Sequence, residues 1–141
     1  MEIAIYLLFG ILGAVIPYGL TRELAVEPVK ASALPSLILA LGFYFFPQIV
    51  SENLNFHIPV IFFGASFVGM VSKKILPYYL EVALAGILFS MLYLNASSFF
   101  NGYGGGLGTP ACISVLSIYG LKKVKTLVRF FSVKKNSDAK N

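Results

Sequence analysis

The placement of positive charge is the sequence feature that most constrains this fold. The chain carries eleven Lys and Arg residues, and all of them lie in three segments that long apolar runs separate. They are Arg22, Lys30, Lys73, Lys74, Lys122, Lys123, Lys125, Arg129, Lys134, Lys135 and Lys140. Loops rich in Lys and Arg stay on the cytoplasmic side of a membrane. The pattern therefore predicts that alternate loops of this chain lie on opposite sides of a bilayer.

Five apolar runs are long enough to be considered as membrane spans. They cover residues 3–20, 31–50, 58–72, 75–96 and 104–121. A transmembrane helix needs about 20 residues, so the third and fifth runs are short. Five spans with the N-terminus outside place every basic residue in the cytoplasm, whereas four or six spans do not. The sequence predicts an all-α polytopic protein with five transmembrane helices and a cytoplasmic C-terminus, in the cytoplasmic (inner) membrane of a prokaryote.

Composition agrees with this class. Hydrophobic residues make up 57% of the 141 residues, charged residues 12%, and mean hydropathy is +0.82. These values are typical of a membrane protein rather than a soluble domain. We expect one transmembrane domain over residues 1–133, and the acidic start Met1-Glu2 predicts no cleavable signal peptide. Since topology accounts for the net charge of +5, the lipid bilayer is the expected partner and nucleic acid is not.

A basic segment follows the fifth run. On a helical projection Lys122, Lys125 and Arg129 share one face. The apolar residues of the segment fall mostly on another face: Leu121, Val124, Leu127, Val128 and Phe131. This predicts a basic amphipathic extension of the fifth helix at the anionic cytoplasmic surface, although topology alone would also explain the charge. Residues 134–141 are predicted to be a disordered basic tail.

A glycine cluster precedes the fifth apolar run. It contains Gly104, Gly105, Gly106 and Gly108, and Thr109-Pro110 after it predicts a helix start with threonine as N-cap. A helix from there to the first lysine is about 18 Å long, against a hydrocarbon core of about 30 Å. Either the cluster lies at membrane depth, or it is an external turn and the lysines reach back to the surface.

Small residues recur at helix-contact spacing in two runs. Gly10, Gly13 and Ala14 lie in the first, and Gly64, Ala65 and Gly69 lie in the third. Such patterns let two helices approach closely. They predict tight packing, either inside one chain or along the seam of a dimer.

Few residues could carry chemistry. Glu81 is the only acidic residue inside a predicted span, so it is either coupled to solute movement or paired with Lys73 or Lys74 at the interface. Serines within the predicted spans could line a solute path or bond to a carbonyl one turn back. The second is favoured for most of Ser36, Ser66, Ser90, Ser114 and Ser117. Ser66 and Ser90 remain transport candidates together with the following residues: Glu81, Gly104, Gly105, Gly106, Gly108, Thr109 and Pro110.

No enzyme motif is present. The single histidine, His57, has no cysteine or carboxylate at metal-ligand spacing, so the sequence predicts no metal site, no cofactor and no enzymatic activity.

Several landmarks resemble the short five-span subunit of the threonine/serine exporter-like family. They are Ile16-Pro17, Pro28-Val29-Lys30-Ala31, Leu54-Asn55, Ala65-Ser66 and Val68-Gly69, within residues 7–72. That family usually has Pro-Gly in its fourth helix, where this chain has Ala85-Gly86, and the glycine cluster has no counterpart there. The resemblance implies a component that exports a small organic solute, an amino acid or small carboxylate, with a larger membrane subunit or as an oligomer.

Two rival functions follow from the residues themselves. The scarcity of polar groups inside the spans suits a non-transporting membrane scaffold or assembly subunit. Small size and glycine breaks suit a homo-oligomeric channel.

Overall fold

A computed structural model describes residues 2–46, 48, 51–100 and 105–138, with side chains in α4 through Asn95 and in α5 through Arg129. The described chain is all-helical and contains no strand. Its five helices are α1 (Glu2–Glu23), α2 (Pro28–Phe45), α3 (Glu52–Gly69), α4 (Tyr79–Phe100) and α5 (Gly108–Asp138). The predicted all-α class is confirmed.

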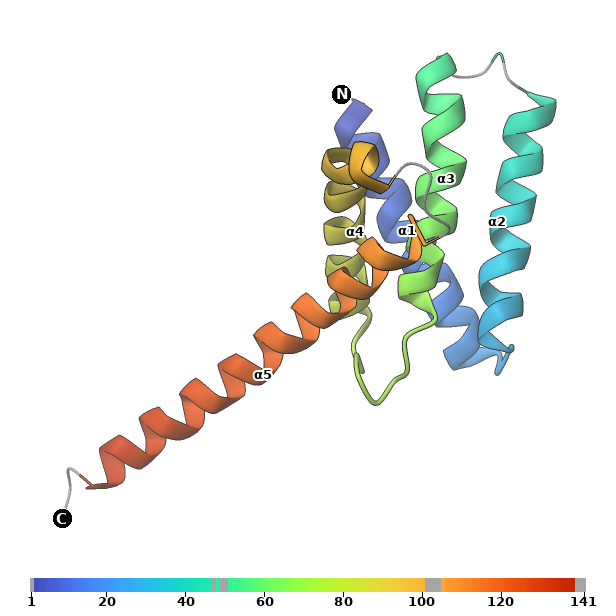
Figure 1. The fold of residues 1–141 in the computed structure, drawn as a ribbon. Coiled ribbons are helices and arrows are strands. Elements are labelled where there is room, and N and C mark those ends of the chain that lie inside the picture. Colours follow the sequence, from blue (N-terminus) through green and yellow to red (C-terminus); the bar gives the residue numbers. More distant parts are fainter. Residues whose placement is uncertain (1, 47, 49–50, 101–104, 139–141) are drawn as a thin grey trace.

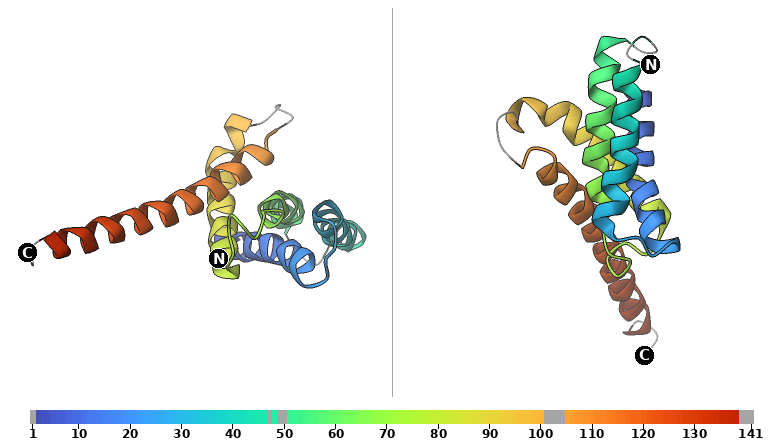
Figure 2. Two further views of the ribbon diagram at one scale, coloured as in Figure 1. Left: turned by 90° about the horizontal axis from the view of Figure 1, so that it is seen from below. Right: turned by 90° about the vertical axis from the view of Figure 1, so that its right-hand side faces the viewer.

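Helix α1 lies at the centre of the bundle. It packs along both α3 and α4, while α2 lies on the outer side of α1 and α3. The start of α5 packs on α4 and α3, and the rest of α5 extends obliquely away from the other helices (Figures 1 and 2). Successive helices among the first four run in opposite directions (Figure 1).

Small residues make these contacts close. A Cβ atom added at Gly13 would lie 2.6 Å from the carbonyl oxygen of Phe62 on α3. One added at Gly86 would lie 2.6 Å from the carbonyl oxygen of Gly10 on α1. Because real Cβ atoms do not approach so closely, only glycine allows α1 to contact both neighbours at these points.

The predicted small-residue positions lie at contacts within this chain. Gly10 faces Ser90 and Gly86 of α4, and Gly64 faces the ring of Phe89. Gly69 lies against the carbonyl of Ala14, which is fully buried, as is Ala65. All six thus serve the packing of one chain in this structure.

Helix boundaries differ from the apolar runs for local reasons. The third run begins at Ile58, but α3 begins six residues earlier, since Glu52 suits the first turn of a helix electrostatically. The fourth run begins at Ile75, but α4 begins at Tyr79, because Pro77 disfavours helical geometry in the residue before it. The second run extends to Val50, but α2 ends at Phe45.

Helix α5 continues well past its apolar part. It has 31 residues, which correspond to about 46 Å of helix. The predicted disorder over 134–141 does not hold for residues 134–138, which are helical; residues 139–141 lie outside the described residues. Since the extension has no proline or glycine after Gly120, nothing in its sequence interrupts the helix.

Large apolar side chains face outward on all five helices. Leu8, Ile38, Phe63, Leu84 and Leu116 are each at least 40% exposed. By length and hydropathy, α1 and α2 could cross a membrane, and residues 79–95 of α4 form a shorter apolar helix. This weakly favours a membrane protein, while five spans remain a prediction.

Candidate functional site

The basic residues of the bundle gather at one end, here called the basic end, where α1 is connected to α2 and α3 to α4 (Figure 1). Arg22 lies in the last turn of α1, Lys30 in the first turn of α2 and Lys73 in the connection between α3 and α4. Lys122 of α5 reaches Glu81 near the start of α4. The opposite end, called the far end, carries Glu2 and Glu52 but no Lys or Arg in the described chain.

At the basic end, Lys122 joins α5 to α4. Its Nζ atom lies 2.9 Å from Oε1 of Glu81 and 3.2 Å from Oε2. The same ammonium lies 5.4 Å from the ring centroid of Tyr78, within cation–π range. The Glu81 side chain is only 18% exposed, so this pair is better shielded from water than a surface ion pair.

The sequence left two alternatives for Glu81: coupling to solute movement, or an ion pair with Lys73 or Lys74, which precede it by eight and seven residues. The second alternative named the wrong lysines, because the partner of Glu81 is Lys122. Instead, Nζ of Lys73 donates to the backbone carbonyl of Arg22 at 3.2 Å. The connection between α3 and α4 folds toward α1, which takes Lys73 away from Glu81.

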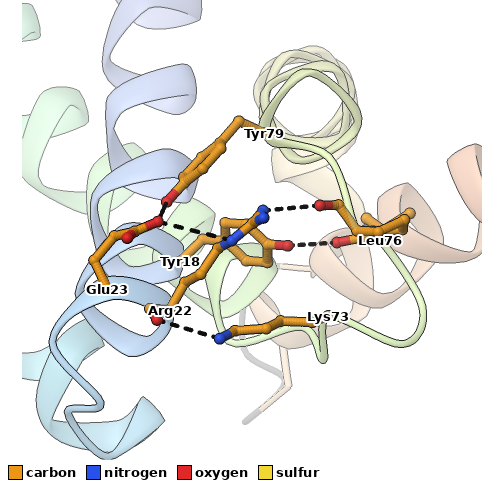
Figure 3. A network of polar contacts seen from close by, with 7 residues as sticks. Tyr18, Arg22, Glu23, Lys73, Leu76 and Tyr79 are labelled. Atoms are coloured by element: carbon orange, nitrogen blue, oxygen red, sulfur yellow. Dashed lines mark hydrogen bonds and ion pairs between the residues drawn. The ribbon is translucent and has the colours of Figure 1, made fainter.

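A cluster of aromatic and basic side chains holds the connection between α3 and α4 against α1 (Figure 3). The Tyr18 hydroxyl donates to the carbonyl of Leu76 at 2.7 Å, and a guanidinium nitrogen of Arg22 donates to the carbonyl of Pro77 at 2.9 Å. The Tyr79 hydroxyl donates to Glu23 at 2.8 Å, and the Arg22 guanidinium lies 5.0 Å from the Tyr79 ring centroid. These bonds satisfy carbonyls that precede α4, so the cluster has a structural role.

Helix α5 begins beside the middle of α3 rather than at an end of the bundle (Figure 1). Leu107, just before α5, lines an apolar groove of about 480 Å³ together with Val60 and Phe63 of α3. Gly108 lines a second groove with Phe67. Phe63 lies about 16 Å along α3 from Glu52. Along the axis of α3, the start of α5 at Leu107 and Gly108 thus lies between the two ends of the bundle.

The predicted cap of α5 is replaced by a different contact. Thr109 lies inside the first turn, and its hydroxyl donates back to the carbonyl of Gly105 at 3.1 Å. The threonine is therefore not the N-cap, because the helix starts one residue earlier, at Gly108. Pro110, which is buried, still lies in the first turn, where a missing N–H costs nothing. Gly104 lies outside the described residues; Gly105 is exposed and Gly106 is half-buried.

The two candidate serines form hydrogen bonds to different helices. Ser66 shares a 2.5 Å hydrogen bond with Ser32 of α2, whereas Ser90 donates to the carbonyl of Tyr6 on α1 at 3.3 Å. All five serines singled out also donate to a carbonyl three or four residues earlier, as the sequence favoured: Ser36, Ser66, Ser90, Ser114 and Ser117. The serines do not combine with Glu81 into one polar site.

His57 lies on α3 near the far end, and its ring faces Tyr93 of α4 and Tyr6 of α1. Its Nδ1 atom is 3.3 Å from the Tyr93 hydroxyl, and its ring contacts that of Tyr6 edge-on. Within the described residues no three His, Cys, Asp or Glu side chains come together as a metal site would need.

Sequence reasoning missed Lys122, Tyr78 and the Tyr18–Arg22 cluster. Tyr18 and Arg22 are four residues apart and so share a helix face, which is a usable signal. Lys122 is the first charged residue after the fifth run. The short length of that run was the one sequence signal that Lys122 could lie close to α4.

Comparison of the chain with protein-family models, with curated proteins and with solved structures gave no match. The exporter resemblance therefore stays a prediction.

Proposed function

We propose that this chain is a five-span membrane subunit that helps to export a small organic solute, an amino acid or small carboxylate. It would act with a larger membrane partner or as an oligomer. The outward-facing apolar side chains and the gathering of basic residues at one end support this topology. The solute class and the outward direction rest on the resemblance to exporter subunits.

One observation carries the transport proposal, and it is the start of α5 beside the middle of α3. In a bilayer this start would lie near the midplane. Transporters build solute sites from interrupted helices whose ends meet at that depth. The N-terminal end of α5 carries partial positive charge, which would favour the carboxylate of a solute.

A flux experiment tests the proposal. Vesicles containing the full chain, with any partner that co-purifies in gentle detergent, are loaded with labelled amino acids or small carboxylates, and efflux is measured. Gly108→Leu should slow efflux but preserve the fold, because a Cβ atom at Gly108 meets nothing within 4 Å. Gly42→Leu is the matched control, since a Cβ atom there is equally free. The proposal fails if no amino acid or small carboxylate leaves these vesicles faster than it leaves loaded vesicles that contain no protein.

Glu81 gives a second variant for the same assay. Glu81→Gln removes the charge from the Lys122 pair while keeping the shape of the side chain. If Glu81 is coupled to solute movement, the variant inserts normally and loses efflux. Wild-type efflux at every pH would assign Glu81 a structural role alone.

Topology can be tested separately. With Cys112→Ser as background, a cysteine introduced at Asn136 should be labelled only from the cytoplasmic side of the membrane. Labelling by an impermeant reagent outside intact cells would exclude five spans with an outside N-terminus.

A non-transporting scaffold is favoured by a different observation. The buried serine hydroxyls already have partners within the chain, so they are not free to bind a solute. A larger partner that co-purifies without any efflux would support this scaffold. A closed homo-oligomer by native mass measurement would instead support a channel.

A further inference from the structure

We propose that a pocket at the far end of the bundle binds a small organic cation, of the class of alkylated ammonium ions. The pocket lies between the end of α2 and the start of α3 and has a volume of about 340 Å³. Three aromatic rings, a carboxylate and an amide line it, from Phe43, Tyr44, Glu52, Asn55 and Phe56. This site is unrelated to the start of α5, and the inference does not depend on the transport proposal.

Helical spacing explains why these side chains meet. Glu52, Asn55 and Phe56 are three and four residues apart and so lie on one face of α3. Phe43 and Tyr44 lie in the last turn of α2, which runs antiparallel to α3 (Figure 1). Rings from both helices therefore border the pocket. The Glu52 carboxylate lies in the first turn of α3.

The electrostatic surroundings of the pocket favour a cation. Glu52 is exposed and has no ion-pair partner among the described residues. The last turn of α2 contains no basic residue. The negative end of the α2 dipole and the positive end of the α3 dipole both lie at this pocket and offset each other, so the Glu52 carboxylate supplies the net charge. No Lys or Arg occurs anywhere between Lys30 and Lys73 in the sequence. An incoming cation would thus meet negative potential without competition from a nearby lysine or arginine.

The aromatic rings select an organic cation over a metal ion. Tyr44 is 77% exposed and Phe56 is 66% exposed, so both rings are accessible to a ligand. The face of an aromatic ring attracts a cation that lies against it. A weakly hydrated ammonium carrying methyl groups can contact the rings directly, whereas a hydrated metal ion keeps its water. The pocket volume lies at the lower end of small-molecule sites, about 300 Å³.

A binding measurement with choline tests the proposal. The full chain is purified in an uncharged detergent, and affinity is measured by calorimetry and by saturation-transfer NMR. The comparison ligand is the neutral isostere of choline, in which carbon replaces nitrogen. We expect choline to bind at least threefold more tightly than the isostere, and Glu52→Gln to weaken choline binding by about threefold. Phe56→Leu should weaken it by about two- to fivefold.

Matched controls come from the same end of the chain. Glu2→Gln removes a carboxylate that does not line the pocket, and Phe46→Leu removes a nearby exposed ring that does not line it. Neither should change choline affinity. Glu52 is exposed, so Glu52→Gln should keep the helical content, which circular dichroism checks. Equal affinity for choline and the isostere, or an unchanged affinity in Glu52→Gln, would overturn the proposal.

Discussion

Lys122 of α5 and Glu81 of α4 form the one ion pair that joins two helices in the described part of the chain. The two residues are 41 positions apart, and their charged atoms lie 2.9 Å apart. The pair fixes the point at which α5 leaves the bundle, because beyond it the described α5 side chains are largely exposed.

We predict that this ion pair contributes measurable coupling between α4 and α5. In a double-mutant cycle of Glu81→Gln and Lys122→Met, the coupling free energy should be about 1 kcal/mol, at the upper end for exposed pairs since Glu81 is shielded. Unfolding in detergent, followed by circular dichroism, gives the four stabilities. Lys123→Met, which changes a neighbouring exposed lysine, should show no coupling to Glu81→Gln. Additive effects of Glu81→Gln and Lys122→Met would contradict the prediction.

Gly69 lies so close to α1 that any side chain at this position should destabilise the fold. Gly69→Ala should lower the free energy of unfolding by about 1–3 kcal/mol, because the added Cβ would press on the Ala14 carbonyl. Gly120→Ala is the control: its Cβ meets nothing within 4 Å, and alanine favours helix by up to about 1 kcal/mol. Thermal unfolding of both variants measures this. Equal midpoints would show that the α1–α3 contact is not as close as described.

The turn after α1 holds a non-glycine residue in left-handed geometry. Ala25 has φ 52°, and the next amide, of Val26, donates to the carbonyl of Leu20 at 3.3 Å. This contact caps the end of α1. We expect Ala25→Gly to raise the free energy of unfolding by about 0.5–1 kcal/mol by removing the Cβ penalty. Ala25→Val should lower it, since a β-branched residue is worse there. A destabilised Ala25→Gly would be the contrary result.

The basic extension of α5 should associate with anionic lipid. Leu121, Val124 and Val128 are each more than half exposed, beside Lys125 and Arg129. A polarity-sensitive dye on a cysteine placed at Asn136, in a Cys112→Ser background, should shift to shorter emission wavelength when phosphatidylglycerol is added to neutral vesicles. Salt should reverse the shift, since the attraction is screened.

The control for this prediction changes charge at a different site. Replacing Lys125 and Arg129 by Gln should weaken the lipid-dependent shift, and Lys30→Gln should leave it intact. An equally large shift in the double variant would show that Lys125 and Arg129 do not contact the lipid.

Several features of this fold could be predicted from local patterns in the sequence. Apolar runs fixed the number and order of the helices, because a helix satisfies its backbone hydrogen bonds internally and needs no partner for that. The distribution of lysine and arginine predicted which connections share an end of the bundle, and Arg22, Lys73 and Lys122 meet at that end. Serines were expected to bond to their own helix for the same local reason.

Only the tertiary structure decided which residues meet across helices. The partner of Glu81 is Lys122 rather than the nearer Lys73, because the path of one connection and the crossing of two helices set that distance. The start of α5 beside Phe63 depends likewise on where α4 ends in space. Hydrogen bonds within a helix join residues a few positions apart, so sequence spacing reveals them, whereas contacts between helices depend on crossing geometry that no local pattern encodes.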